Sequence, residues 1–241
     1  MTADRWAQGV RHQLGLGRLL PLGGPRDGTW IAEAAAVAVL RSAVAAGVPD
    51  VRLGTVRISL ADPGDVRESV VPPPPSALSP GPLRVTADFA AAAAEPLPAT
   101  ASRLRLALAT AAAERLGLTV PEVDLRVTDL LEAADTQADS VRAPQPPSAR
   151  ETTDPDESRV VAAVLSVPGV TRLTGSLGGL ARAVHIEQRA GDASLPHRHV
   201  RVEVAVGSDY RAVEVARKVR AAVRQACEDH PTVAVLVTSV E

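Results

Sequence analysis

Two histidines one residue apart are the first candidates for chemistry in this sequence. His197 and His199 have the spacing that places both imidazoles on one side of a strand, where they could bind a metal ion. A zinc site needs at least a third protein ligand, and His185, Cys227 and His230 belong to other predicted elements. We therefore predict no metal site and interpret the pair as exposed loop histidines. Because Cys227 is the only cysteine, the chain can form neither an intrachain disulfide nor a thiolate cluster.

A glycine-rich stretch is the second candidate, because such loops can cradle phosphate groups. Residues 175–179 read Gly-Ser-Leu-Gly-Gly and match the GxxG pattern that clamps a nucleic-acid backbone in KH domains. Strands rather than helices are predicted on both sides, and the stretch lacks the Gly-Lys-Ser/Thr of a P-loop. No serine stands in a G-x-S-x-G context. We interpret the stretch as a flexible loop and predict a protein that is not an enzyme and holds no cofactor.

Three arginines on one face of a predicted helix are the third candidate. Arg217, Arg220 and Arg224 could together bind phosphate or an anionic surface. Glu214 and Glu228 flank them at spacings that allow ion pairs along the helix. The pattern favours a solvated, salt-bridged helix face and leaves an anion or nucleic-acid binding module as the alternative function.

The composition limits the classes of protein that remain. The chain has 241 residues, a net charge of −2 and a pI near 6.2, whereas a dedicated nucleic-acid binder usually carries a strong basic footprint. Residues 1–20 lack the continuous apolar stretch of a signal peptide, and no segment reaches the roughly 18–20 apolar residues that span a bilayer. We therefore expect a cytoplasmic protein without a direct membrane span. Lys218 is the only lysine among many arginines, a bias typical of a GC-rich genome such as an actinobacterial one.

The predicted helices and strands that must position any site form an internal duplication, in which one α/β unit occurs twice. An apolar helix runs into Val-Pro-Asp-Val at 48–51, and another runs into Val-Pro-Gly-Val at 167–170. Each is followed by an alternating strand, an amphipathic helix and a closing strand, at 123–128 and 233–238. The offset of about 110–120 residues is the size of a whole domain. We predict an α+β fold of two tandem small domains, each a roughly three-stranded sheet with two helices packed on one face, in helix-strand-strand-helix-strand order.

The predicted boundaries follow changes in composition. Residues 1–27 form an N-terminal amphipathic segment, and 28–131 form the first domain, with a proline-rich loop at 61–82 that should be extended and mobile. Residues 132–156 are acidic and proline-rich, which predicts a solvated linker open to proteolysis. Residues 157–241 form the second domain.

The closing strand of the second domain predicts an interface. It is apolar on both faces, whereas the outward positions of the equivalent strand at 123–128 are polar. One face must cover the domain's own helices. The other, with Ala234, Leu236 and Val240, should contact the first domain or another copy of the chain, because a row of exposed apolar side chains is unfavourable. The alternative is a strand buried inside its own sheet by the glycine-rich loop.

Four segments of the second half resemble a known family. They are the helix that ends in Val-Pro-Gly-Val at 160–170, the strand at 200–206, the Ala-Val-Glu-Val-Ala-Arg-Lys-Val helix at 212–219 and the valine-rich strand at 233–240. In their order and spacing they resemble the alkaline shock protein family of bacterial envelope-stress proteins. The first half is similar to a more diverged copy, with the insertion at 61–82.

The resemblance implies a non-enzymatic structural or scaffold protein of the cell-envelope stress response, which acts through protein–protein interaction and self-association. It implies a small membrane-anchored partner protein, or paralogous family members, and recruitment from the cytoplasm to the inner face of the cell membrane. It brings no catalytic residues, and nucleic acid is not an expected partner. A tandem copy departs from the single domain that is usual in the family.

Overall fold

The protein has a mixed α+β fold, as the sequence predicts, with a six-stranded and a three-stranded sheet. The computed structural model describes residues 16–93, 95–131, 145–176, 181–189 and 197–241. The strands are β1 (Leu19–Pro21), β2 (Thr29–Ala32), β3 (Val51–Leu60), β4 (Leu83–Ala92), β5 (Glu122–Leu131), β6 (Val170–Leu173), β7 (Val184–Arg189), β8 (His197–Val206) and β9 (Thr232–Val240). The helices are α2 (Glu33–Gly47), α3 (Leu97–Thr110), α4 (Pro155–Leu165) and α5 (Ala212–Ala226), with the π-helical turn η1 (Ala111–Leu116) continuing α3.

The three-stranded sheet has the order β3-β4-β5, in which β3 is antiparallel and β5 is parallel to the central β4. Val85, Ala87 and Phe89 of β4 are buried, in agreement with the predicted alternation. α3 and η1 make the crossover from β4 to β5. They end at Gly117, the predicted C-cap, whose φ of 89° lies in the left-handed region that glycine adopts without strain.

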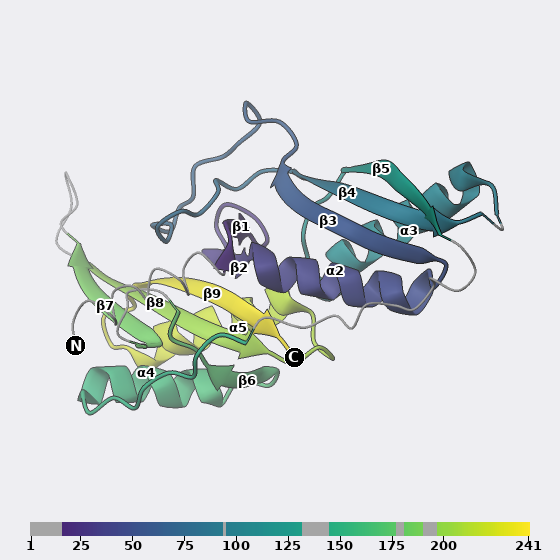
Figure 1. Cartoon of the computed structure of the whole chain (residues 1–241). Coiled ribbons are helices and arrows are strands. Elements are labelled where there is room, and N and C mark those ends of the chain that lie inside the picture. The colour runs from purple at the N-terminus through teal and green to yellow at the C-terminus, as the bar shows by residue number, and fades with distance from the viewer. Residues whose placement is uncertain (1–15, 94, 132–144, 177–180, 190–196) are drawn as a thin grey trace, which may run out of the picture.

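Helix α2 lies between the two sheets and contacts β3 of one and β9 of the other (Figure 1). Its only charged residues are Glu33 and Arg41, and the rest of the helix is dominated by alanine and valine. Small side chains allow a helix to be covered on most of its surface by close neighbours. The helix ends at Gly47, before Pro49, as predicted. One apolar core runs through both sheets and their helices.

The six-stranded sheet has the order β1-β2-β9-β8, and β6 and β7 pair with successive parts of the far edge of β8. It is larger than the predicted three strands because two N-terminal segments join it. β2 runs parallel to β9, with Trp30 opposite Leu236, and β1 pairs antiparallel with β2. The sequence suggests a turn-rich connection at 19–25 and a helix from Ile31. Residues 19–21 are instead the buried strand β1, and the helix begins two residues later than expected, at Glu33, because Ile31 and Ala32 end the buried strand β2.

The two sheets share one strand topology and one irregularity. Each contains an antiparallel hairpin followed by a helix and a strand parallel to the second strand of the hairpin. Both parallel ladders skip one residue, Thr128 in β5 and Thr238 in β9. Thr128 Oγ1 donates to Phe89 O, and Thr238 Oγ1 donates to Val204 O, each at 3.2 Å. The bulged threonines occupy the positions that the sequence comparison of 123–128 with 233–238 places in register.

The proline-rich loop at 61–82 contains no strand, but it is anchored to the six-stranded sheet. Val71 is buried, Val70 N donates to Pro25 O, and Ala77 forms a β-bridge with Leu19. The loop therefore covers the β1 edge of that sheet.

Helix α4 begins within the predicted linker, at Pro155, and its N-cap is Asp154. The Asp154 carboxylate accepts from the N–H groups of Asp156 and Glu157 at 2.9 and 3.0 Å. The Gly-Ser-Asp sequence at 207–209 predicts a turn that caps α5, but the helix begins later: its N-cap is Arg211, which makes no side-chain capping bond. Residues 1–15 of the amphipathic segment and 132–144 of the linker lie outside the described residues.

Candidate interaction surface

The two histidines singled out by their spacing lie on β8. His199 is buried, and its Nδ1 lies 2.9 Å from Thr232 Oγ1 on β9, whereas His197 is exposed at the first position of the strand. Their interpretation as loop histidines is wrong, because β8 begins at His197, three residues before its first valine. Among the described residues, no group of three or more His, Cys, Asp or Glu side chains could hold a metal ion.

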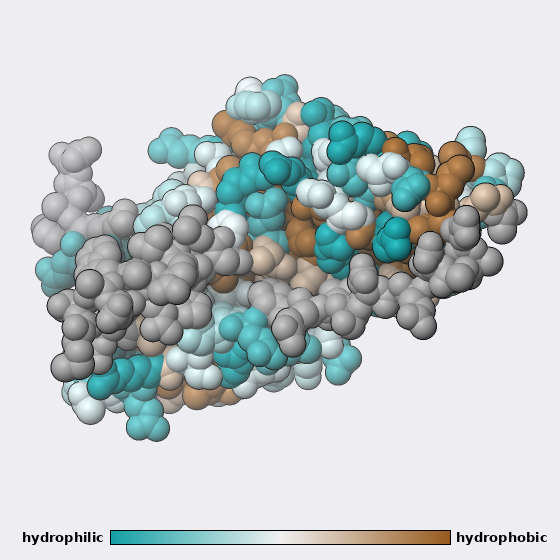
Figure 2. Space-filling model, in the orientation of Figure 1, coloured by the Kyte–Doolittle hydropathy of each residue, from teal (hydrophilic) through white to brown (hydrophobic). Residues whose placement is uncertain are grey.

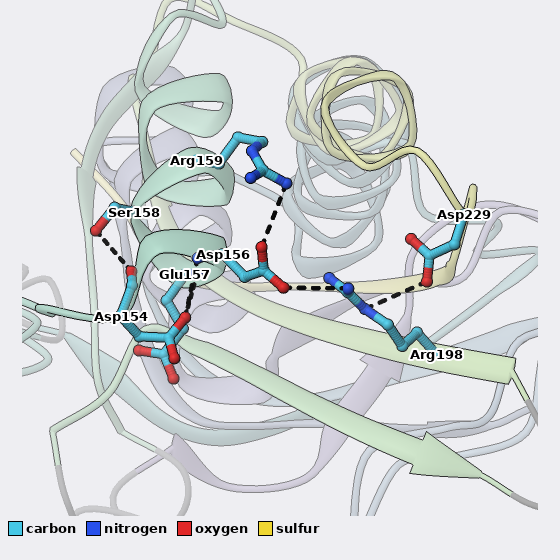
Figure 3. A network of polar contacts seen from close by, with 7 residues as sticks. All are labelled: Asp154, Asp156, Glu157, Ser158, Arg159, Arg198 and Asp229. Carbon is cyan, nitrogen blue, oxygen red and sulfur yellow. Dashed lines mark hydrogen bonds and ion pairs between the residues drawn. The ribbon is translucent and has the colours of Figure 1, made fainter.

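Arg198, between these histidines, joins three elements (Figure 3). Its guanidinium lies 3.1 Å from Asp156 at the start of α4 and 3.3 Å from Asp229 in the turn before β9. Arg159 contacts the same Asp156 carboxylate at 3.3 Å. The Arg198 side chain is only 23% exposed. The carboxylates of Asp156 and Asp229 balance its charge within the chain. This network positions α4 on the sheet.

The three arginines of α5 have different surroundings. Arg217 donates two hydrogen bonds to Asp27, at 3.0 and 2.9 Å. Partial burial raises the pKa of Asp27, but the hydrogen bonds from Arg217 and from the Gly24 N–H outweigh it and lower that pKa. Arg220 is half-buried, and desolvation followed by repulsion from Arg224 lowers its pKa. Of these three arginines, only Arg224 is exposed and makes no ion pair with another described residue.

Ala234, Leu236 and Val240, the predicted interface residues, lie in β9 between β2 and β8. Ala234 and Leu236 are fully buried, and Val240 is half-buried. Leu236 pairs with Trp30 on one side and with Glu203 on the other. Elements of the chain's own N-terminal part, β2 and α2, thus cover this strand.

A cleft of about 1110 Å³ lies between α4, β6 and the segment that precedes α4. Its apolar wall includes Val161 and Leu173. Two of its guanidinium groups are paired within the chain: Arg182 lies 3.3 Å from Glu157, and Arg172 lies 2.6 Å from Glu241. Arg150 and Glu151 also line the cleft.

Three outer edges of the sheets are covered by other parts of the chain. At the β3 edge, Arg18 donates to Ile58 O, Glu33 accepts from Ile58 N, and Arg41 donates to Leu53 O. The β6 edge is paired through Ala149 N with Leu173 O. The loop at 61–82 covers the β1 edge, as described above. Covering an edge protects its backbone groups from pairing with other chains.

Strand β5 differs from these edges. It is ten residues long, and in the described part of the chain its outer edge receives one hydrogen bond, from Arg105 Nε to Val123 O at 3.3 Å. The alternation predicts that Val123, Leu125 and Val127 point inward, yet the first two are only half-buried and Val127 is 42% exposed. Leu130, further along the strand, is 55% exposed. In Figure 2, hydrophobic surface gathers at the end of the molecule where β5 lies in Figure 1.

The outer face of β5 carries charges that are paired with β4. Arg126 donates to Asp88 at 2.8 and 3.0 Å, and this hydrogen bonding lowers the pKa of Asp88. Arg84 contacts Glu122 and Asp124, at 2.5 and 3.5 Å. Asp124 and Arg126 remain 63% and 74% exposed. The strand therefore presents alternating charge on one face and apolar side chains on the other, with an open edge between them.

Sequence reasoning missed β5 as a candidate site. The alternation of 123–128 predicts which face of the strand is apolar, but it carries no information on whether a further strand covers the edge. A usable signal lay in Leu130 and Leu131, which continue the strand beyond that alternation.

No protein-family model matches the chain, and neither does any curated protein. Within the described residues, none of the helices has the length and apolarity needed to cross a membrane.

Proposed function

We propose that this protein is a non-enzymatic structural or scaffold protein that acts through protein–protein interaction and self-association. The observation that carries the proposal is the outer edge of β5, which no strand in the described part of the chain covers. Its outer backbone groups can pair with a strand of another polypeptide, and exposed Val127 and Leu130 add apolar surface beside it. Natural sheets usually protect such edges, and this chain does so at β1, β3 and β6.

The resemblance of the second half to the alkaline shock protein family supports a more specific role in the cell-envelope stress response. In this proposal the protein is cytoplasmic and is recruited to the inner face of the cell membrane. Its partner there is a small membrane-anchored protein or a paralogous family member.

The test is co-purification of the tagged full chain, in mild detergent, from cells that produce it. We expect mass spectrometry of the eluate to find a small membrane protein together with untagged copies of the chain. Val127→Asp should lower the yield of associated protein by placing charge at the β5 edge. The matched control is Val70→Asp, because Val70 is 67% exposed in the loop at 61–82. An eluate from the parent protein without any envelope protein would contradict the envelope role.

A further inference from the structure

The chemistry of β5 specifies a strand that would fit its open edge. Its sequence is Glu-Val-Asp-Leu-Arg-Val-Thr-Asp-Leu-Leu, with opposite charges two residues apart at Asp124 and Arg126. Residues two apart in a strand lie on the same face. In an antiparallel pair, residues directly opposite each other also share a face. A strand with this spacing of charges can therefore be complementary to a second copy of itself.

The register that satisfies this complementarity places Leu125 opposite Leu125 of the second copy. Asp124 then lies opposite Arg126, and Arg126 opposite Asp124, so the same charge pair forms twice. On the other face, Val123 lies opposite Val127, also twice. Opposite charges and apolar side chains directly across a strand pair are both favourable. The half-buried Leu125 and the exposed Val127 would lose contact with water.

Neighbouring registers are less favourable. A shift that centres the pair on Arg126 places two guanidinium groups opposite each other. A shift that centres it on Asp124 places two carboxylates there. Like charges directly opposite each other destabilise a strand pair. The charge row on the outer face thus selects one register.

The existing ion pairs within each chain extend this row. Asp88 of β4 already binds Arg126, whose side chain nevertheless remains 74% exposed and so is open to a further contact. In the selected register the second copy's Asp124 would approach that side chain. Negative and positive groups would then alternate from β4 across the interface. The bond from Arg105 to Val123 O, at the exposed edge, is the one described contact that pairing has to displace.

We propose that two copies of this chain associate by antiparallel pairing of β5 with β5, centred on Leu125, so that the two three-stranded sheets become one six-stranded sheet. This inference rests on the proposed function for the idea that β5 mediates association, and it identifies the partner as a second copy. The two-fold axis passes beside Leu125, and each β5 covers the open edge of the other.

The first experiment reverses the charges singly and together in the full chain. Arg126→Asp and Asp124→Arg should each weaken dimerisation by at least about tenfold, because each creates two like-charge contacts. The double variant Asp124→Arg/Arg126→Asp restores opposite charges and should dimerise like the parent. The double variant still lacks the hydrogen bond from Arg126 to Asp88. A recovery of dimerisation in this variant therefore cannot come from contacts within one chain.

Mixing the two single variants provides a sharper test. The Arg126→Asp chain carries two carboxylates and the Asp124→Arg chain two guanidinium groups, so the selected register makes both contacts complementary in a heterodimer. We expect native mass spectrometry of the mixture to show heterodimers in excess of either homodimer. Circular dichroism and thermal melting confirm that each variant is folded. A monomeric parent at about 100 μM, or a mixture without heterodimer excess, would overturn the proposal.

A crosslink tests the register without altering charge. Opposed residues of an antiparallel pair have Cα atoms about 4.5–5.5 Å apart, which a disulfide can bridge. In a Cys227→Ala background, Leu125→Cys should form a covalent dimer under mild oxidation. Arg57→Cys, at an exposed position of β3, should not. Equal crosslinking at both positions refutes the register. Because these experiments use the purified chain, a dimer that forms in vitro while no envelope protein co-purifies from cells would refute only the envelope role.

Discussion

Replacing Thr238 by valine should destabilise the protein far more than the same change at Thr128, although the two threonines occupy equivalent bulges in β9 and β5. Thr238 and Thr174 are fully buried, and their hydroxyl oxygens lie 2.7 Å apart. Thr238 Oγ1 also donates to Val204 O at 3.2 Å. Thr128 makes only the equivalent bond, to Phe89 O, and is exposed.

The magnitude follows from the bonds lost and from the group left behind. Each hydrogen bond contributes about 1 kcal/mol net, and an unpaired buried hydroxyl costs about 1–3 kcal/mol. Thr238→Val removes two bonds and leaves the Thr174 hydroxyl without its partner. We expect a loss of about 3 kcal/mol in the free energy of unfolding, against about 0.5 kcal/mol for Thr128→Val. The double variant Thr174→Val/Thr238→Val should lose at least about 1 kcal/mol less than the sum of the single losses.

Urea unfolding followed by circular dichroism and tryptophan fluorescence measures these differences, since Trp30 is buried in the six-stranded sheet. With a slope of about 3 kcal/mol per M, the Thr238→Val midpoint should fall by about 1 M. Equal losses at the two positions, or additive losses in the double variant, would refute the reasoning that burial of the shared hydroxyl pair sets the cost.

Three further predictions concern the joining of the two sheets. Leu236→Asp should cost more than about 4 kcal/mol and unfold the whole chain in urea melts, because it places a charge between two strands of the core. A chain cut by protease within 132–144 should still elute as one particle in size-exclusion chromatography, since β2 pairs with β9; separation into two fragments would show that this ladder is weak. Asp27→Asn should lower stability at pH 7 by about 0.5–1 kcal/mol. Because the pKa of Asp27 is lowered in the folded state, the difference should persist above the unfolded value near 4 and disappear as the pH falls through the folded pKa.

Local patterns predicted the parts of the fold that depend on local contacts. The alternation of β4 and β8 marks strands because one face of each is buried throughout. Gly117 ends its helix because its backbone adopts a left-handed φ, a local property that glycine allows. The failures are non-local. β1 and β2 are three and four residues long, too short for a period to be recognised, and β2 is a strand because of a partner at the other end of the chain.

In the candidate site, too, the sequence predicted the local features but not the non-local ones. The apolar residues on both faces of β9 indicated that both faces are covered. No pattern in 233–238 indicates that Trp30 is the neighbour of Leu236. The parity of β5 predicted an apolar and a charged face. Whether another part of the chain covers its edge depends on the three-dimensional arrangement, and among the described residues only Arg105 contacts that edge by a hydrogen bond.

The parallel pairing of β2 with β9 also sets the order of events during synthesis. Trp30 is opposite Leu236, so 206 residues must be added by the ribosome after Trp30 before its neighbour exists. At about 5–20 residues per second this takes roughly 10–40 s. Throughout that interval the nascent chain carries a completed apolar hairpin with no strand beside it. Newly made protein is therefore most vulnerable to aggregation, and most in need of a chaperone, until β9 has been synthesised and inserts between β2 and β8.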